Sequence, residues 1–512
     1  MQQYIYLLGI IVLVTGLTLS NYLMSLGQMI LSINWLLDKN VHLKFKAFFT
    51  NKPALIFTSI FLIHIIGLLY TTDFDYALKD IRTKLPILAL PIIFTTSPAI
   101  SKKKYFLIIY SYITAVLFGT LYAIYYNTVN HISIHDIVTD IFVSHIRFSL
   151  NLCLIICFLF YFMINERQFN YKIKTISGLL LCWFLFFLFL LQAFTGIFIL
   201  IALIFIYLLY VIFTNQNKFI RLTGILFCIA LPIVISFYIL HFYKQNYTLK
   251  PVNFSKLDKF TAKGNPYQHD TLDWNIENGY KTGLYVCMPE LKQAWNERSK
   301  LNFDSCDYQH QPISNTLIRF LNSKGYRKDA NAVTMLTNDE IKDIENGCAN
   351  VNYRSGHLIS SRIYKTMYEI NMYKHTGNTK GYSLVQRLEL WKASLNIIKN
   401  HFWFGVGTGD MVIAFDQELR TMHSDLYGTK LRSHNQYLSI FAALGFIGFL
   451  IFMFALIYPV ILNKRIFNYY FLTFFIIFLL SMLNEDTIET QAGVTFFAFF
   501  YSLCGLAQVE DI

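Results

Sequence analysis

Long apolar runs alternate with short polar segments at both ends of the chain. A transmembrane helix needs about 20 mostly apolar residues. Two of the runs, 4–37 and 175–213, are too long for one span and are interrupted at Ser20-Asn21 and Thr195-Gly196, so each is predicted to form a helical hairpin. The pattern therefore predicts twelve spans, which lie near residues 4–20, 21–37, 54–70, 79–97, 105–126, 147–164, 175–193, 194–213, 222–242, 435–462, 467–483 and 491–507.

The segment 243–433 has a different, polar pattern and lies between two membrane regions. It is long enough to fold as one large, mainly helical domain. About nine predicted spans precede it, in residues 1–242, and about three follow it, in residues 434–512. The predicted fold class is an all-α polytopic membrane protein with about twelve transmembrane helices.

Composition excludes most soluble proteins. Hydrophobic residues make up 55% of the 512 residues and charged residues only 14%, whereas a soluble chain carries about 25% charged residues. The mean hydropathy is +0.43. A net charge of +12 would suggest nucleic acid as a partner of a soluble protein. In a membrane protein, however, Lys and Arg collect in cytoplasmic loops, so we expect no nucleic-acid partner.

The distribution of Lys and Arg predicts the side that each loop faces. With twelve spans and the N-terminus inside, fourteen basic residues fall in the inner loops, and four fall in the short outer loops and outer helix ends. This asymmetry is the positive-inside pattern of membrane proteins, and it places residues 243–433 outside, in the periplasm. The four outer exceptions are Lys79, Arg82, Lys84 and Arg147.

Positive charge at the outer membrane edge runs against the insertion bias and therefore needs a reason. One interpretation is structural, in which these side chains reach toward water or pair with Asp73, Asp75 or Asp80. The other interpretation is an anion site for a lipid diphosphate at the outer leaflet. Arginine suits such a site because its guanidinium binds phosphate oxygens through two parallel hydrogen bonds.

The predicted periplasmic domain contains three cysteines, Cys287, Cys306 and Cys348. An oxidising compartment allows one disulfide among them and leaves one free thiol. We expect the pair to be Cys287 and Cys306.

The end of the polar segment shows helical spacing. Apolar residues recur at steps of three and four over 384–402, which predicts an amphipathic helix with Arg387 and Lys392 on its polar side. Such a helix could lie on the membrane surface and also direct Arg387 toward a site. The GVGTGD sequence at 405–410 lacks the GK[ST] ending of a phosphate-binding loop and is predicted to be a turn.

His434 and Asn435 stand where the polar segment meets the tenth predicted span. A single histidine at a helix start is more often a cap or a surface residue. A neutral imidazole at the outer membrane face, beside several cations, can also act as a general base. Glu485 and Asp486, between the last two spans, are the nearest approach to a metal-binding acidic pair. We expect them to form a solvated turn, and a role near the acceptor is the alternative interpretation.

These residues carry a resemblance. His434, Asn435, Gly445 and Gly448 form H-N-x9-G-x-x-G, which resembles the H-[NSQ]-x9-G-x-x-[GTY] signature of bacterial O-antigen ligases. The run RLELWKASLNIIKNHFWFGVGTGD, 387–410, is similar to the stretch before that signature in the wider O-antigen ligase and polymerase family. The predicted layout of twelve spans with one large periplasmic loop is also similar, and that loop resembles Bacteroidetes-type members.

The resemblance implies an inverting glycosyl transfer that needs no metal and no cofactor. The glycan would move from an undecaprenyl diphosphate carrier to a hydroxyl of lipid A core oligosaccharide, at the periplasmic face of the bacterial inner membrane. His434 would be the general base, and Arg387 would act with it and help to hold the diphosphate. The other substrate-binding residues implied are Lys84, Arg147, Arg82 and Asn435.

Two alternatives remain open at this point. An O-antigen polymerase, or a relative that glycosylates protein Ser or Thr, would share the donor and the topology and differ in the acceptor. A transporter or flippase for lipid-linked sugars belongs to another class. Transporters often carry charged or broken helices at mid-membrane, whereas the candidate residues here gather at the outer face, which favours the enzyme.

Overall fold

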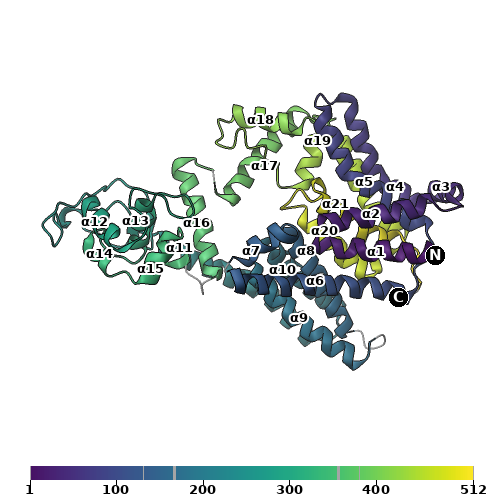
Figure 1. Ribbon diagram of the computed structural model, residues 1–512, viewed down its shortest axis with the longest axis horizontal. Helices are drawn as coiled ribbons and strands as arrows, with labels where there is room; N and C mark the ends of the chain where they lie inside the picture. The colour runs from purple at the N-terminus through teal and green to yellow at the C-terminus, as the bar shows by residue number, and fades with distance from the viewer. Residues whose placement is uncertain (1, 131, 165–168, 354–357, 380, 511–512) are drawn as a thin grey trace. The chain divides into compact units, whose positions relative to one another are not determined.

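The computed structural model describes residues 2–130, 132–164, 169–353, 358–379 and 381–510. The chain forms two compact units (Figure 1). The first, called the helical core, contains residues 1–210 and 387–512. The second, called the polar unit, contains residues 211–386.

The helical core is built almost entirely from helices. Its N-terminal part consists of α1 (Gln2–Leu19), α2 (Asn21–Leu36), α3 (Val41–Thr50), α4 (Lys52–Ile66), η1 (Gly67–Tyr70), α5 (Phe74–Thr96), α6 (Lys102–Asn130), α7 (Ile134–Ile137), η2 (Val138–Phe142), α8 (His145–Ile164), α9 (Tyr171–Leu191) and α10 (Phe194–Thr214). Its C-terminal part consists of α17 (Ser383–Asn400), α18 (Met411–Thr421), α19 (Gln436–Leu462), η5 (Arg465–Phe467), α20 (Tyr469–Ser481), η6 (Thr487–Glu489), α21 (Gln491–Phe500) and η7 (Tyr501–Leu506).

The first predicted hairpin is confirmed. Helices α1 and α2 are separated at Ser20, whose side chain accepts a hydrogen bond from the Tyr22 N–H and so caps α2. The two helices pack closely through glycine, because a Cβ on Gly27 would lie 2.6 Å from the Leu13 backbone. Ordinary side chains at this contact would force the helices apart.

The second predicted hairpin is also present, but its break lies earlier than expected. Helix α9 ends at Gln192, which has a left-handed backbone with φ of 54°. The glycine of the predicted break, Gly196, lies inside α10, where its missing side chain allows contact with α8. A Cβ there would be 2.6 Å from the Ser149 Cβ. The glycine therefore serves helix packing and does not end the helix.

Eight of the described helices are long and apolar enough to cross a membrane: α1, α4 with η1, α6, α8, α9, α10, α11 (Lys218–Tyr247) and α19. Helices α20 and α21 are apolar but shorter, and α2 has 16 residues. Helix α5 is long enough, but its first half contains several charged residues. The protein is thus a mainly α-helical membrane protein, and the count of twelve spans remains a prediction.

Helix α19 is broken at Gly445, where φ is 67° and ψ is −172°. Only glycine adopts this backbone conformation without large strain. The GVGTGD loop fills the break. Val406 N–H and Gly407 N–H donate to the carbonyls of Ala442 and Ala443, at 3.0 and 2.9 Å.

The same break is bridged from its other side. The N–H groups of Phe446 and Ile447 donate to the carbonyls of Phe402 and Trp403, at 2.7 and 3.3 Å. The loop is therefore more than the predicted turn. Together with Phe402 and Trp403, it supplies the backbone partners that α19 loses at Gly445. This matters in a membrane, where an unpaired backbone group is costly.

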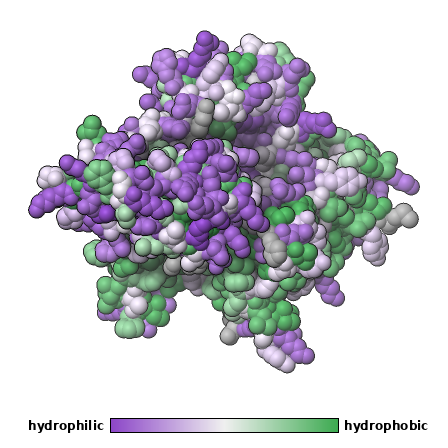
Figure 2. All heavy atoms as spheres, turned by 60° about the vertical axis from the view of Figure 1, so that its left-hand side comes forward, coloured by the Kyte–Doolittle hydropathy of each residue, from purple (hydrophilic) through white to green (hydrophobic). Residues whose placement is uncertain are grey.

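The polar unit has a small core of its own. Its elements are α11, η3 (Phe254–Lys256), β1 (Ile276–Glu277), β2 (Tyr280–Lys281), α12 (Met288–Arg298), α13 (Ile313–Ser323), α14 (Ala330–Thr334), α15 (Asn338–Glu345), η4 (Val351–Tyr353) and α16 (Leu358–Thr376). Trp295, Leu317 and Phe320 are fully buried between α12, α13 and α14. Figure 2 shows the mainly hydrophilic surface of this part, which comes forward from the left of Figure 1.

The expected disulfide does not form in this unit. Cys287 is a buried free thiol at the start of α12, and Cys306 is an exposed free thiol. The backbone of Cys306 forms an isolated antiparallel β-bridge with Pro312. The prediction rested on the compartment and the number of cysteines, and neither determines distance.

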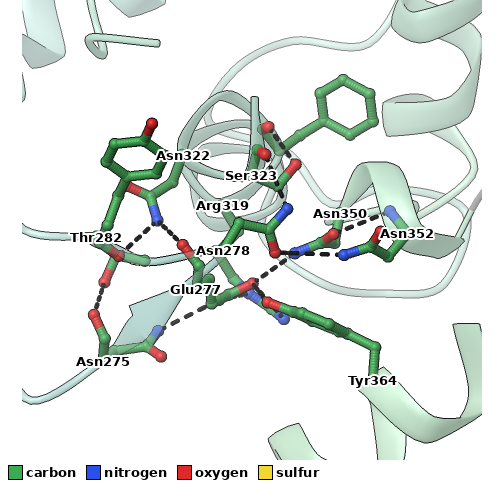
Figure 3. A network of polar contacts seen from close by, with 12 residues as sticks. Asn275, Glu277, Asn278, Thr282, Arg319, Asn322, Ser323, Asn350, Asn352 and Tyr364 are labelled. Carbon is green, nitrogen blue, oxygen red and sulfur yellow. Dashed lines mark hydrogen bonds and ion pairs between the residues drawn. The ribbon is translucent and has the colours of Figure 1, made fainter. Parts of the chain in front are cut away.

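A buried charge network ties the strands of the polar unit to its helices (Figure 3). Glu277 is fully buried, and its carboxylate accepts hydrogen bonds from Arg319 Nε at 2.6 Å, Asn350 Nδ2 at 3.1 Å and the Tyr364 hydroxyl at 3.3 Å. The Arg319 guanidinium also lies 3.9 Å from the centre of the Tyr368 ring. Segments far apart in sequence thus share one carboxylate.

We expect Arg319→Leu to destabilise the polar unit by about 3–5 kcal/mol, because it leaves a buried carboxylate without its cation. Native-state proteolysis of the full chain at sites within 211–353 measures this free energy of local opening. Lys292→Met is the control, because it removes an exposed ion pair with Asp304 and should change the free energy by at most about 1 kcal/mol. Equal effects of the two substitutions would contradict the assignment.

Candidate functional site

The site begins where α19 starts. Asn435 is the N-cap of this helix, and its side-chain oxygen accepts from the Leu438 N–H at 3.2 Å. Its Nδ2 group donates to the Leu483 carbonyl at 3.1 Å. Both ends of the amide are therefore occupied, and Asn435 positions the helix start next to the segment that follows α20.

His434 lies just before this cap in a left-handed backbone conformation, with φ of 49°. Its backbone N–H donates to Asp486 Oδ2 at 2.9 Å, and this bond holds the unusual conformation. The half-buried imidazole forms no hydrogen bond with the described residues. A ring held by its backbone and left without a partner is available for chemistry.

Asp486 organises the segment around His434. Its Oδ1 atom accepts from the hydroxyls of Ser439 at 2.6 Å and Ser433 at 3.2 Å. Asp486 and Glu485 are each only 8% exposed, so the expected solvated turn is wrong. The two carboxylates are buried because the chain between α20 and α21 folds back onto the start of α19.

Two of the three predicted arginines reach this acidic pair. Arg387, on α17, donates from Nη2 to Glu485 Oε1 at 3.0 Å. Arg147, on α8, donates from Nη2 to the Asp486 carbonyl at 3.2 Å. Arg147 is 7% exposed, and its Nη1 atom is buried without a hydrogen-bond partner. Arg147, Arg387 and His434 are thus gathered at one place by Glu485 and Asp486.

The electrostatics of Glu485 follow from this arrangement. Burial raises the pKa of its carboxyl, and the nearby Arg147, Arg387 and His434 only partly oppose this shift. Glu485 holds Arg387 through its carboxylate, and the Asp486 carbonyl holds Arg147.

Lys84 occupies a second cluster beside the first. It is 1% exposed, and its ammonium group donates to both oxygens of Asp80, at 2.6 and 2.7 Å, and to Glu489 Oε2 at 2.8 Å. All three donors are used, as the structural interpretation of the outer cations predicted. Arg432 also donates to Glu489 Oε2 at 2.6 Å.

Glu489 is the centre of this second cluster. Burial would raise the pKa of its carboxyl, but Lys84 and Arg432 hold it well below its usual range. Gln436 Nε2 donates to the other oxygen at 2.9 Å. Because Gln436 is the first residue of α19, the cluster fixes the same helix start that carries His434.

A small cavity of about 20 Å³ opens between these helices, with room for a single water molecule. Its polar lining includes Lys84, Glu489, Arg432 and His64. His64 is buried, and its Nδ1 lies 2.7 Å from the Ile60 carbonyl. The cavity is too small for a sugar.

The remaining predicted residue, Arg82, is exposed on α5. The predicted helix at 384–402 is present as α17. Two residues of its predicted apolar stripe, Leu388 and Leu395, are exposed. Leu390 and Ala393, which were not part of the stripe, are buried. The stripe suits a lipid-facing surface, and the smaller neighbouring face packs on the protein.

Sequence reasoning missed much of the supporting shell. The pairing of Lys84 with Asp80 was among the predictions, and their i, i+4 spacing places them on one helix face. Arg432, Glu489 and His64 were not predicted. Arg432 lies two residues before His434, and Glu489 follows Glu485 and Asp486 in NEDTIE. His64 gives no signal, because a histidine within an apolar helix looks like any other buried polar residue. The described residues include no cluster of His, Cys, Asp and Glu that could hold a metal ion.

Comparison with known proteins adds one finding. None of the curated proteins compared with the chain matches it. The family model described as O-antigen ligase matches residues 348–453, a range that contains α17, the GVGTGD loop, His434 and the break at Gly445. Residues 348–453 thus resemble the O-antigen ligase family, which supports an O-antigen ligase-like family for this chain.

Proposed function

We propose that this protein is a membrane glycosyltransferase that moves a glycan from undecaprenyl diphosphate to lipid A core oligosaccharide at the periplasmic face of the inner membrane. The observation that carries the proposal is that Arg147, Arg387 and His434 all contact Glu485 or Asp486. Arg387 and His434 also lie within residues 348–453, which match the O-antigen ligase family model. Two guanidinium groups and one imidazole suit a reaction that releases an anion and takes up a proton.

In this reaction the acceptor hydroxyl oxygen attacks the anomeric carbon of the donor sugar. The new C–O bond forms as the bond to the diphosphate oxygen breaks, and the anomeric configuration inverts. His434 accepts the hydroxyl proton, and undecaprenyl diphosphate leaves as an anion. The proton then passes to water or to the leaving group, and the imidazole is neutral again.

The arginines stabilise the charge that develops on the diphosphate. Preorganised cations in a partly desolvated site stabilise the transition state more than water can. Arg147 has a buried donor without a partner, and Arg387 is a quarter exposed, so both have donors to offer. Lys84 and Asn435 act as positioning residues in this proposal, because their polar groups are already engaged.

The proposal is tested in a deletion strain complemented with the wild-type chain. A ligase leaves lipid A core without polymer when it is lost, and carrier-linked polymer accumulates. A polymerase instead leaves core that carries single repeat units. Unchanged lipopolysaccharide together with lost protein glycosylation would identify a protein O-oligosaccharyltransferase, and unchanged glycans of every kind would reject the proposal.

Arg147→Ala and Arg387→Ala should each lower kcat/KM for the lipid-linked donor by about 10- to 100-fold, because each removes a hydrogen bond to a charged group. The measurement is transfer by purified protein at varied donor concentration. Lys392→Ala is the matched control, since Lys392 is an exposed cation on the same helix as Arg387, and it should keep near wild-type activity. Normal donor use by both site variants would reject the diphosphate assignment.

A further inference from the structure

A second, larger pocket lies at the other end of α19, away from His434. It has a volume of about 490 Å³, which is within the range of small-molecule sites. Helix α19 has 27 residues and is long and apolar enough to cross a membrane, so this pocket lies at the opposite membrane edge. It is lined by Asn51, Asn463, Lys464, Arg465, Phe467, Asn468, Leu506, Ala507 and Gln508.

The lining of this pocket is positively charged. It contains Lys464 and Arg465, and no Asp or Glu is among the described residues that line it. Neither cation forms an ion pair with a described residue. Arg465 uses one donor, on the Ala507 carbonyl at 3.3 Å, which leaves most of its guanidinium available.

Two helices also begin at the pocket. Asn51 caps the start of α4, and Asn468 caps the start of α20. Helix N-termini carry partial positive charge and unpaired N–H groups, so they favour anions. Helix C-termini lie at the pocket as well, since Asn51 is also the C-cap of α3 and Asn463 is the C-cap of α19. The helix ends therefore do not decide the charge of the ligand, whereas the cations Lys464 and Arg465 do.

The pocket is also held together by chain segments far apart in sequence. Ile100 N–H donates to the Gln508 carbonyl at 2.9 Å, and Glu510 N–H donates to the Ile100 carbonyl at 3.2 Å. These bonds anchor the C-terminal segment that carries Leu506 to Gln508. Lys464 and Arg465 therefore line a pocket whose opposite wall, residues 506–508, is held in place by hydrogen bonds to Ile100.

We propose that this pocket binds a phosphate group, at the membrane edge opposite the glycosyl-transfer site. Phosphate fits because the lining offers two cations and several amide groups, and because no Asp or Glu is among the described residues that line the pocket. The group can belong to an anionic phospholipid headgroup or to a free phosphate in the adjoining solution, and the two sources share this recognition chemistry. The proposal does not depend on the proposed transferase activity.

The test uses the full chain, purified in detergent and in nanodiscs. Asn468→Asp keeps a good helix cap and places a negative charge at the pocket. Asn170→Asp is the matched control, since Asn170 likewise caps α9 but does not line the pocket. Lys464→Gln with Arg465→Gln is the second variant, and Lys172→Gln with Lys174→Gln is its control.

Native mass spectrometry counts bound phosphatidylglycerol against phosphatidylcholine, and thermal stabilisation measures inorganic phosphate. We expect the pocket variants to lose about tenfold in affinity or more, while the controls bind as wild type does. Loss confined to phosphatidylglycerol identifies a lipid headgroup, and loss confined to inorganic phosphate identifies a free phosphate. Equal binding by pocket and control variants, or no binding of either probe by the wild type, would overturn the proposal.

Discussion

Replacing His434 by asparagine is expected to lower glycan transfer by about 10²- to 10⁴-fold, the usual contribution of a general base. Asparagine tolerates the left-handed backbone that His434 adopts. The bond to Asp486 comes from the backbone N–H, so it survives the substitution. The loss should therefore appear in kcat, with the protein still folded and the donor still bound.

The measurement is transfer by the purified variant at saturating donor, with folding followed by gel filtration. His401→Asn is the control, because His401 is exposed at the end of α17 and its loss should leave the rate unchanged. A His434→Asn protein that transfers glycan at the wild-type rate would show that another group accepts the proton.

Gly445→Ala should disrupt the structure of α19 around its break. We expect the variant to lose both stability and activity. An alanine Cβ would lie 2.3 Å from the Phe404 N atom, and the backbone conformation at this position is open only to glycine. The strain, and the loss of bonds between α19 and the inserted loop, should cost about 3 kcal/mol or more. The start of α19, with His434, would move with the loop.

Thermal stability in detergent, followed by gel filtration after heating, measures this effect. Gly178→Ala is the matched control. Gly178 lies within α9, and a Cβ there would be no closer than 3.5 Å to its nearest neighbour, so stability should be unchanged or slightly higher. If Gly445→Ala retained wild-type stability, the helix break would not depend on glycine.

Much of the helical framework could be predicted from the sequence. Apolar length alone locates α6, α8, α10 and α19, and the polar interruption at Ser20 correctly divides α1 from α2. The division of α9 from α10 was misplaced because Gly196 looks like a break, although it serves close packing on Ser149. A glycine has several uses, and local sequence does not distinguish them.

The candidate site was predictable where a motif marks it, as at His434 and Asn435, and where a charge is unusual for its position. Arg147 stands out because a cation is costly in an apolar segment. The burial of Glu485 and Asp486 could not be predicted, because it depends on the segment after α20 returning to the start of α19. The full set of Lys84 partners could not be predicted for the same reason, because Asp80 is close to Lys84 in sequence but Glu489 is far away.

The insertion of residues 402–407 into the break of α19 has a consequence for biosynthesis. A broken helix cannot enter lipid alone, because its backbone groups at the break would remain unpaired. The ribosome synthesises the loop about 40 residues before the break that it fills, so its donors and acceptors already exist when α19 emerges. We therefore expect this segment and α19 to enter the membrane together, with the pairing at the break complete only once residue 447 has been synthesised.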